Sequence, residues 1–138
     1  MNAKNKKLAG PLVSIVDDDV SVRRSTLRLL SSSGLRAEAF ALAEDFLNSG
    51  RAEETGCLLL DVRMPGMGGL ELQRHLAETG QSIPIVFLSA RASEEEQCRA
   101  LQAGAAGFLR KPVSKEALLN AIRAVLQGPV NNEQKDLL

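Results

Sequence analysis

Residues 57–61 read Cys-Leu-Leu-Leu-Asp, a short, continuously apolar run that ends in a carboxylate. Similar apolar runs lie at 12–17 and 83–89, and two more stretches of strand length lie at 35–40 and 106–110. Stretches with helical periodicity separate these five runs, and this alternation predicts an α/β fold with a parallel sheet. The three continuously apolar runs suit central strands that are covered on both faces, whereas 35–40 alternates small apolar and charged residues as an edge strand does.

The intervening helices carry recognisable start and stop signals. Left-handed helix ends are predicted at four glycines that follow helical stretches, Gly34, Gly80, Gly104 and Gly128. The fourth helix opens with Ser93 and Glu96 at the spacing of a capping box, but we expect it to offer only alanines, Cys98 and Leu101 to the core. An element with few large apolar contacts shifts at low free energy. The fourth helix is therefore the expected moving part.

Composition limits what the chain does. Over 138 residues, 17 Lys and Arg balance 17 Asp and Glu, and 44% of the residues are apolar. This size suits one core, so we expect one domain at 11–127, a flexible leader at 1–10 and a linker or tail at 128–138. Zero net charge excludes the strongly basic surface of a domain that binds nucleic acid by itself. Because no apolar run reaches the roughly 18 residues of a membrane span and the start lacks a signal-peptide core, we expect a cytoplasmic protein without membrane contact.

Polar side chains interrupt this plan where strands end. Asp17 and Asp18 follow the first run, Asp61 ends the third, Ser89 ends the fourth, and the fifth leads into Lys111. Ligands of open parallel sheets bind at this edge. Converging carboxylates repel each other by about 4 kcal/mol per pair at roughly 4 Å and an effective dielectric near 20, so a cation is needed. Mg²⁺ fits, because it is hard and is commonly held by carboxylates together with phosphate.

The same edge carries the groups that phosphoryl transfer requires. Lys111 and Ser89 supply donors for phosphate oxygens, and the Asp61 carboxylate can act as a nucleophile. Catalysis at such a site is mostly positioning and charge neutralisation. Taken singly, each residue has an ordinary explanation, such as a strand-end aspartate, a solvated lysine or a backbone-bonded hydroxyl. Asp19 is expected only to cap the helix that begins near Val20.

Four motifs, taken together and in order, resemble the receiver domain of bacterial two-component response regulators. They are IVDDD at 15–19, LLLDVRMPGMGGLEL at 58–72, PIVFLSA at 84–90 and FLRKPV at 108–113. The resemblance runs from about residue 12 to residue 127 and is closest to receivers that precede helix-turn-helix DNA-binding domains in the FixJ and NarL style. It implies a flavodoxin-like, doubly wound (βα)5 fold with a five-stranded parallel sheet in the order 2-1-3-4-5.

The resemblance also implies a role for each acidic residue. Asp61 would be the phosphoacceptor and a metal ligand. Asp18 would bind Mg²⁺, or Mn²⁺ in its place, directly, and Asp17 would bind it through water. The backbone carbonyl of Arg63 would complete the protein ligands of the metal.

A second group of residues would contact the phosphoryl group and report on it. The resemblance implies this role for Ser89 and Lys111, and it makes Phe108 the aromatic residue whose rotation follows the state of the site. It further implies a cis peptide bond between Lys111 and Pro112.

The predicted function is a phosphorylation switch. A sensor histidine kinase would donate a phosphoryl group to Asp61, and the domain would catalyse only its own phosphotransfer and dephosphorylation. Movement at Ser89 and Phe108 would then repack the fourth helix, the fifth strand and the fifth helix into an interface for a homodimer or an output domain. That output domain, absent from this chain, would bind DNA and control transcription.

Three alternatives stay open at this point. The chain could be a stand-alone, single-domain response regulator, or an inert receiver that serves only as an interaction module. It could also be a Mg²⁺-dependent phosphatase of the haloacid dehalogenase type, which uses a strand-end aspartate as nucleophile. Those enzymes need a second aspartate two residues later, where this chain has Arg63.

Overall fold

The computed structural model describes residues 10–127, which are built around a five-stranded parallel sheet. The strand order is β2-β1-β3-β4-β5, as predicted. The strands are β1 (Leu12–Val16), β2 (Arg36–Phe40), β3 (Thr55–Leu60), β4 (Ile85–Ser89) and β5 (Gly107–Arg110). All four neighbouring pairs are parallel. Residues 1–9 of the predicted leader at 1–10 lie outside the described residues, as does the predicted tail at 128–138 with the helix end at Gly128.

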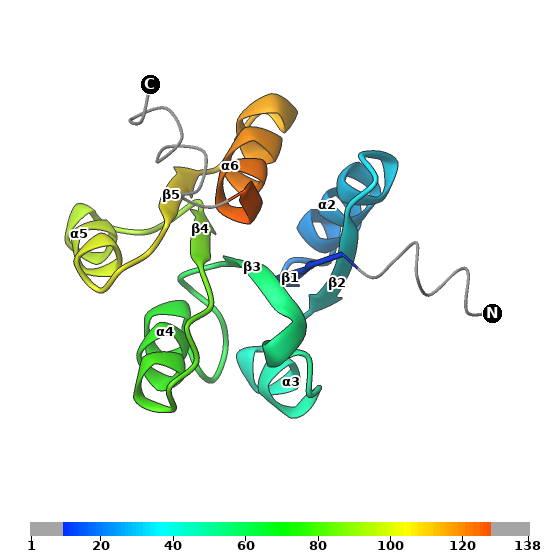
Figure 1. The fold of residues 1–138 in the computed structure, drawn as a ribbon. Coiled ribbons are helices and arrows are strands. Elements are labelled where there is room, and N and C mark those ends of the chain that lie inside the picture. Colours follow the sequence, from blue (N-terminus) through cyan, green and yellow to red (C-terminus); the bar gives the residue numbers. More distant parts are fainter. Residues whose placement is uncertain (1–9, 128–138) are drawn as a thin grey trace, which may run out of the picture.

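Five α-helices in the described region cover the two faces of the sheet (Figure 1). Helices α2 (Val20–Ser32) and α6 (Lys115–Gln127) lie on one face. The other face carries α3 (Ala43–Asn48), α4 (Gly69–Glu78) and α5 (Glu94–Gln102). A 3-10 turn (Ala52–Glu54) leads into β3. This is the predicted doubly wound (βα)5 arrangement. None of the described helices combines the length and the apolar character needed to cross a bilayer.

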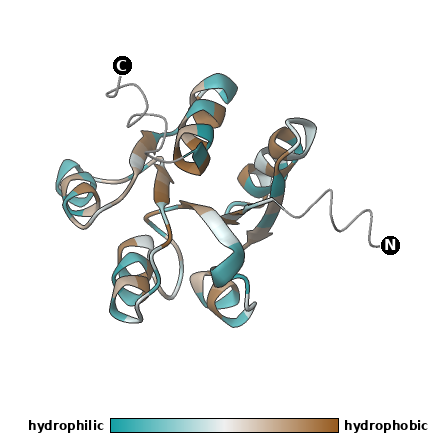
Figure 2. Ribbon diagram, viewed as in Figure 1, coloured by the Kyte–Doolittle hydropathy of each residue, from teal (hydrophilic) through white to brown (hydrophobic). Residues whose placement is uncertain are grey.

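Strand β3 shows why the central strands read as unbroken apolar runs. Cys57 and Leu59 pack into the cluster beneath α2 and α6, and Leu58 and Leu60 pack into the cluster on the opposite face. Because successive side chains of a strand point to opposite faces, a strand covered on both sides needs apolar residues at every position. Figure 2 shows the matching pattern in the helices, whose hydrophobic sides turn toward the sheet. Cys57 is fully buried in its cluster and is a packing residue, and this burial raises the pKa of its thiol to about 12.

Two strand starts differ from the prediction by two residues, and the other strand boundaries by no more than one. Strand β3 begins at Thr55, two residues early, because Thr55 pairs with Leu12 across a register irregularity. Strand β4 begins at Ile85 and not at residue 83. The Pro84 carbonyl still accepts a hydrogen bond from the Leu58 N–H at 2.9 Å, but proline has no N–H of its own with which to continue a ladder.

Helix α5, the fourth of the predicted helices, packs through small side chains. Ala100 is its one buried residue, whereas Cys98 and Leu101 are exposed, so the expectation that these two face the core was wrong. At 3.6 residues per turn, the face that buries Ala100 turns positions 98 and 101 outward. The predicted capping box is confirmed: Ser93 Oγ accepts from the Glu96 N–H at 3.1 Å and Glu96 Oε1 accepts from the Ser93 N–H at 2.9 Å.

The predicted glycine helix ends are confirmed within the described region. Gly34, Gly80 and Gly104 have φ values of 78°, 79° and 103°, in the left-handed region that favours glycine. Each lies directly after the last turn of its helix. After each of these glycines the chain leaves its helix and enters the next strand of the sheet.

Candidate functional site

The C-terminal ends of four strands meet at one edge of the sheet. Asp17 follows β1, Asp61 follows β3, Ser89 ends β4, and Lys111 follows β5. They lie around a hollow of about 480 Å³, which Asp18, Asp61, Ser89 and Lys111 all border. The structure therefore brings together the polar residues that the strand ends predicted.

Backbone pairing fixes the two deeper carboxylates. The Asp17 N–H donates to the Phe40 carbonyl at 3.1 Å and the Asp61 N–H donates to the Val16 carbonyl at 3.0 Å, so both residues continue the sheet ladder. Asp17 is only 2% exposed. Asp17, Asp18 and Asp61 each place a carboxylate oxygen within 4.8 Å of the others.

Asp19, the next residue, has the structural role that was expected of it. Its Oδ1 accepts from the Ser21 N–H at 2.8 Å and from the Val22 N–H at 3.3 Å, which caps α2. Its own N–H donates to Asp17 Oδ1 at 2.9 Å. The start of α2 thus helps to orient the Asp17 carboxylate toward the site.

Lys111 places a cation among these acids. Its Nζ lies 2.8 Å from Asp17 Oδ2 and 3.6 Å from Asp61 Oδ2. Burial by itself lowers the pKa of Lys111, but the hydrogen bond to Asp17 and the charges of Asp17 and Asp61 outweigh it, so the pKa is raised. The peptide bond from Lys111 to Pro112 is cis, as the family resemblance implied.

The Asp61 carboxyl lies in surroundings that disfavour its charge. Burial and the nearby Asp17 charge raise its pKa, although Lys111, the Arg63 N–H and Ser89 act in the opposite direction. One lysine among three carboxylates leaves an excess of negative charge. A further cation would relieve it, since an opposite charge within about 4–6 Å favours the ionised form of a carboxyl.

The donor set fits a hard divalent cation. All three side chains offer oxygen atoms, which Mg²⁺ and Mn²⁺ prefer, and Asp18 is exposed at the rim where an ion retains water ligands. The Arg63 N–H donates to Asp61 Oδ1 at 3.4 Å, which places the Arg63 backbone beside the cluster. Ligation by the Arg63 carbonyl stays a prediction.

Ser89 borders the same hollow as Asp61, and Phe108 packs against the neighbouring strand β4. Ser89 is buried at the end of β4 and borders the hollow with Asp61. The half-buried Phe108 ring stacks on Phe87 with 5.6 Å between centroids, and the Arg110 guanidinium lies 5.6 Å from its ring centroid. Arg110 in turn donates to the Ala92 carbonyl at 2.7 Å, just before α5.

The Arg63 side chain makes contacts that sequence analysis missed. Its Nη2 lies 2.8 Å from Glu96 Oε1, and its Nε donates to the Arg91 carbonyl at 3.3 Å. The sequence predicts for Glu96 only its part in the capping box at the start of α5. Arg63 and Glu96 are 33 positions apart, and no motif or periodicity connects them.

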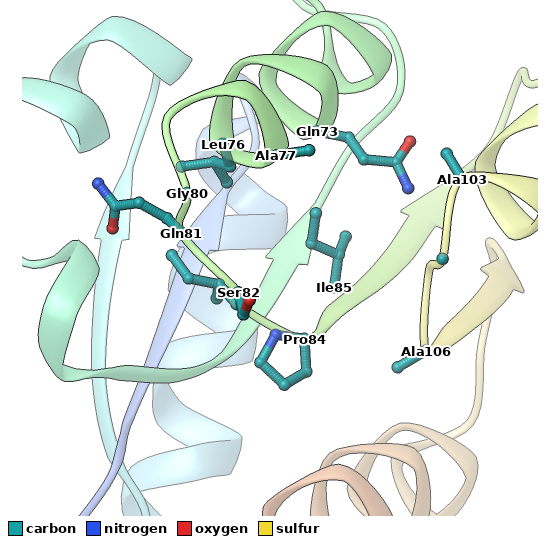
Figure 3. A pocket seen from close by; sticks show the side chains of 12 residues that line it. Gln73, Leu76, Ala77, Gly80, Gln81, Ser82, Pro84, Ile85, Ala103 and Ala106 are labelled. Atoms are coloured by element: carbon teal, nitrogen blue, oxygen red, sulfur yellow. The ribbon is translucent and has the colours of Figure 1, made fainter.

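A second hollow, of about 520 Å³, opens at the opposite edge of the sheet. Figure 3 shows it between α4 and the segment after α5, with Gln73, Leu76 and Ile85 among its lining residues. No ionisable side chain lines it. It therefore offers no group for phosphoryl transfer, and the acidic edge is the candidate site.

Comparison with known proteins agrees with this geometry. The family model for the response regulator receiver domain matches residues 13–123. The chain belongs to this family. Receiver domains generally bind Mg²⁺ at an acidic cluster of the kind that Asp17, Asp18 and Asp61 form here. Family membership supports the receiver interpretation over the phosphatase alternative.

Individual relatives are response regulators. The receiver is 45% identical over 116 residues to response regulator protein TodT of Pseudomonas putida, covering 84% of this chain and 51% of TodT. It is 39% identical over 114 residues to transcriptional regulatory protein FixJ of Azorhizobium caulinodans, covering 83% of this chain and 54% of FixJ. The solved structure of response regulator StyR is 46% identical with a TM-score of 0.81, covering 93% of this chain and 65% of that one. The receiver thus spans about half the length of TodT and FixJ.

Proposed function

We propose that this receiver, the unit at 11–127, accepts a phosphoryl group on Asp61 from the phosphohistidine of a sensor kinase. The observation that carries the proposal is the convergence of three carboxylates within 4.8 Å around Asp61, with Lys111 Nζ 3.6 Å from its Oδ2. A nucleophile, a cation and a hard-metal donor set thus share one accessible hollow. We place the exchange in the cytoplasm, where we expect the kinase to present its phosphohistidine.

In the transfer, a carboxylate oxygen of Asp61 attacks phosphorus as the phosphorus–nitrogen bond to the kinase imidazole breaks. An acyl phosphate forms on Asp61, and the electron pair of the broken bond stays on the leaving imidazole. Lys111 is placed to neutralise charge on the transferring group, and the Ser89 hydroxyl is placed to donate to one of its oxygens. Mg²⁺, held by Asp17, Asp18 and Asp61, would supply additional charge neutralisation. The same site would later hydrolyse the acyl phosphate.

The phosphorylated carboxyl would then bias a switch. Phosphorylation adds roughly 1.5 to 2 negative charges and new acceptor oxygens next to Ser89 and Lys111. Movement of these groups would change the packing of Phe108 on β5 and of α5 beside it. Both arrangements pre-exist, and the phosphoryl group shifts their populations.

The decisive experiment exposes the protein to acetyl phosphate and measures its mass. We expect an adduct of roughly 80 Da that needs Mg²⁺ and disappears in Asp61→Asn. Asp45→Asn is the matched control, because Asp45 is an exposed aspartate on α3 that neither borders the hollow nor belongs to the carboxylate cluster. Absence of the adduct from the wild-type protein would overturn the proposal and favour the inert interaction module.

We further propose that phosphorylation promotes a homodimer through α5, β5 and α6. Leu101 on α5 is a large apolar residue that is 45% exposed, and the edge strand β5 lies between the two helices. We expect Leu101→Asp to abolish beryllofluoride-induced dimerisation in sedimentation velocity while leaving the Asp61 adduct intact. A dimer that survives this substitution would place the interface elsewhere.

We propose transcription as the regulated output, carried by a DNA-binding domain joined to this receiver. The half-length match to TodT and FixJ supports this proposal. The alternative, a stand-alone single-domain regulator, needs no such domain. Sequencing the gene beyond the codon for Leu138 distinguishes the two, because only the joined protein has a reading frame that continues into a second domain.

A further inference from the structure

Helix α5 is held at both ends by polar contacts and contributes little apolar packing. At its C-terminal end, Gln73 Nε2 on α4 donates to the Ala100 carbonyl at 3.0 Å, and Figure 3 shows Gln73 extending from α4 toward the segment after α5. At its N-terminal end, Arg63 contacts Glu96 at 2.8 Å and the Arg91 carbonyl at 3.3 Å. Since Ala100 is the one buried residue of α5, these contacts help to fix the position of the helix.

The Arg63–Glu96 ion pair connects α5 to the acidic edge. Arg63 lies two residues after Asp61, donates its N–H to Asp61 Oδ1 at 3.4 Å and borders the same hollow as Asp61. The Arg63 side chain is 55% exposed and that of Glu96 is 21% exposed. Ion pairs at this exposure shift an equilibrium by no more than about fivefold. The pair is therefore weak enough to be replaced by a stronger anion.

We propose that Arg63 exchanges Glu96 for the phosphoryl group when Asp61 is phosphorylated, and that this exchange releases the first turn of α5. The inference rests on the proposed function. The new group places roughly 1.5 to 2 negative charges beside Arg63. A guanidinium binds phosphate oxygens through two parallel hydrogen bonds, which favours them over the single contact to Glu96. The buried Gln73 contact remains, so α5 turns about its C-terminal end.

If this exchange occurs, Glu96 stabilises the unphosphorylated arrangement of α5. The ion pair exists only in the unphosphorylated arrangement, so weakening it favours the phosphorylated one. Glu96→Gln tests this without removing the capping box, because glutamine fills the same capping position. We expect Glu96→Gln to bind beryllofluoride, with Mg²⁺ present, two- to fivefold more tightly than the wild-type protein.

The experiment titrates the 138-residue chain with beryllofluoride at constant Mg²⁺. Fluorine NMR measures occupancy, and proton–nitrogen NMR follows the backbone amides of residues 94–102. The variants are Glu96→Gln, Arg63→Gln, their combination, and Glu95→Gln as control. Glu95→Gln removes one negative charge from the adjacent, exposed position in the same turn.

Three results together support the exchange. Glu96→Gln binds more tightly while Glu95→Gln matches the wild-type protein. In the free Glu96→Gln protein, the Leu101 and Gln102 amide signals shift toward their positions in the beryllofluoride-bound wild type. In the Arg63→Gln background, Glu96→Gln adds no further gain. A mere loss of helix stability would not shift distant amides toward the bound state.

Two results overturn the exchange while leaving the proposed function intact. One is a wild-type protein that binds beryllofluoride and a Glu96→Gln variant that behaves like Glu95→Gln. The other is a gain from Glu96→Gln that persists without Arg63. If beryllofluoride fails to bind the wild-type protein at all, the proposed function itself falls, and the inference falls with it.

Discussion

At the scale of single residues, Asp61 lies in surroundings that disfavour its ionised form. Burial and Asp17 raise its pKa above the ordinary aspartate value near 3.9. The folded protein therefore holds the Asp61 proton more tightly than the unfolded chain does. Ionisation of Asp61 reduces the free energy of unfolding at any pH above the folded pKa, and this penalty vanishes below the unfolded pKa.

We therefore expect Asp61→Asn to raise the melting temperature at pH 7 in the absence of divalent metal, because the variant removes the disfavoured charge. The gain should shrink as the pH falls toward about 3.5, where the wild-type carboxyl is protonated in both states. Thermal unfolding followed by circular dichroism across this range measures the effect. An equal gain at every pH would contradict the assigned cause.

Lys111 is the complementary case, because it is the cation that the described carboxylates share. We expect Lys111→Met to lower the free energy of unfolding by about 1–3 kcal/mol without metal, since Asp17 loses its partner at 2.8 Å. The deficit should narrow in 10 mM Mg²⁺, because the metal then neutralises the exposed excess of negative charge. Lys115→Met, at the exposed first residue of α6, controls for loss of a surface charge. If Mg²⁺ leaves the loss of unfolding free energy in Lys111→Met unchanged, Lys111 and the metal do not neutralise the same carboxylates.

At the scale of elements, the start of α4 depends on a glycine for steric reasons. A Cβ atom at Gly69 would lie 2.2 Å from the Asp61 carbonyl oxygen, closer than any side chain tolerates. The close approach lets α4 begin directly behind the strand end that carries Asp61.

We expect Gly69→Ala to cost about 1–3 kcal/mol in denaturant unfolding and to weaken Mg²⁺ binding, because the added carbon pushes the Asp61 backbone away. Gly107→Ala is the matched control. Its Cβ would meet only Val86 methyl groups, at 3.8 and 3.9 Å, which is ordinary contact. Equal costs for the two substitutions would refute the steric argument.

Some of the helices, strands and contacts were predictable from the sequence, and others were not. The apolar run at β3 was predictable, because burial on both faces requires apolar residues at successive positions. The strand-end position of Asp61 and Lys111 followed from the same pattern. The orientation of α5 did not, because its sequence EEEQCRALQ carries no apolar period that marks one face, and Cys98 and Leu101 were assigned to the wrong face. The contact between Arg63 and Glu96 leaves no periodic trace at all.

At the scale of the molecule, metal binding and folding are linked. Three carboxylates from β1 and β3 approach one another only in the folded sheet, so an ion that binds them binds the native state. A ligand present at 100 times its Kd stabilises the native state by about 2.7 kcal/mol.

We therefore expect millimolar Mg²⁺ to raise the melting temperature of the wild-type protein and to have little effect on Asp18→Asn. Asp18 is exposed at the rim of the site, so this variant should fold normally. Differential scanning calorimetry at several Mg²⁺ concentrations makes the comparison. If the melting temperature of the wild-type protein does not change with the Mg²⁺ concentration, the acidic edge is not a metal site.

The hydrogen bond between Lys111 and Asp17 joins residues that are 94 positions apart in the chain. During synthesis, Asp17 and Asp61 leave the ribosome well before Lys111 does, and β5 closes the sheet last. A nascent chain that has exposed its acids but not its lysine has no complete pocket. The site that would hold the metal and the phosphoryl group is therefore complete only after residue 111 has been synthesised.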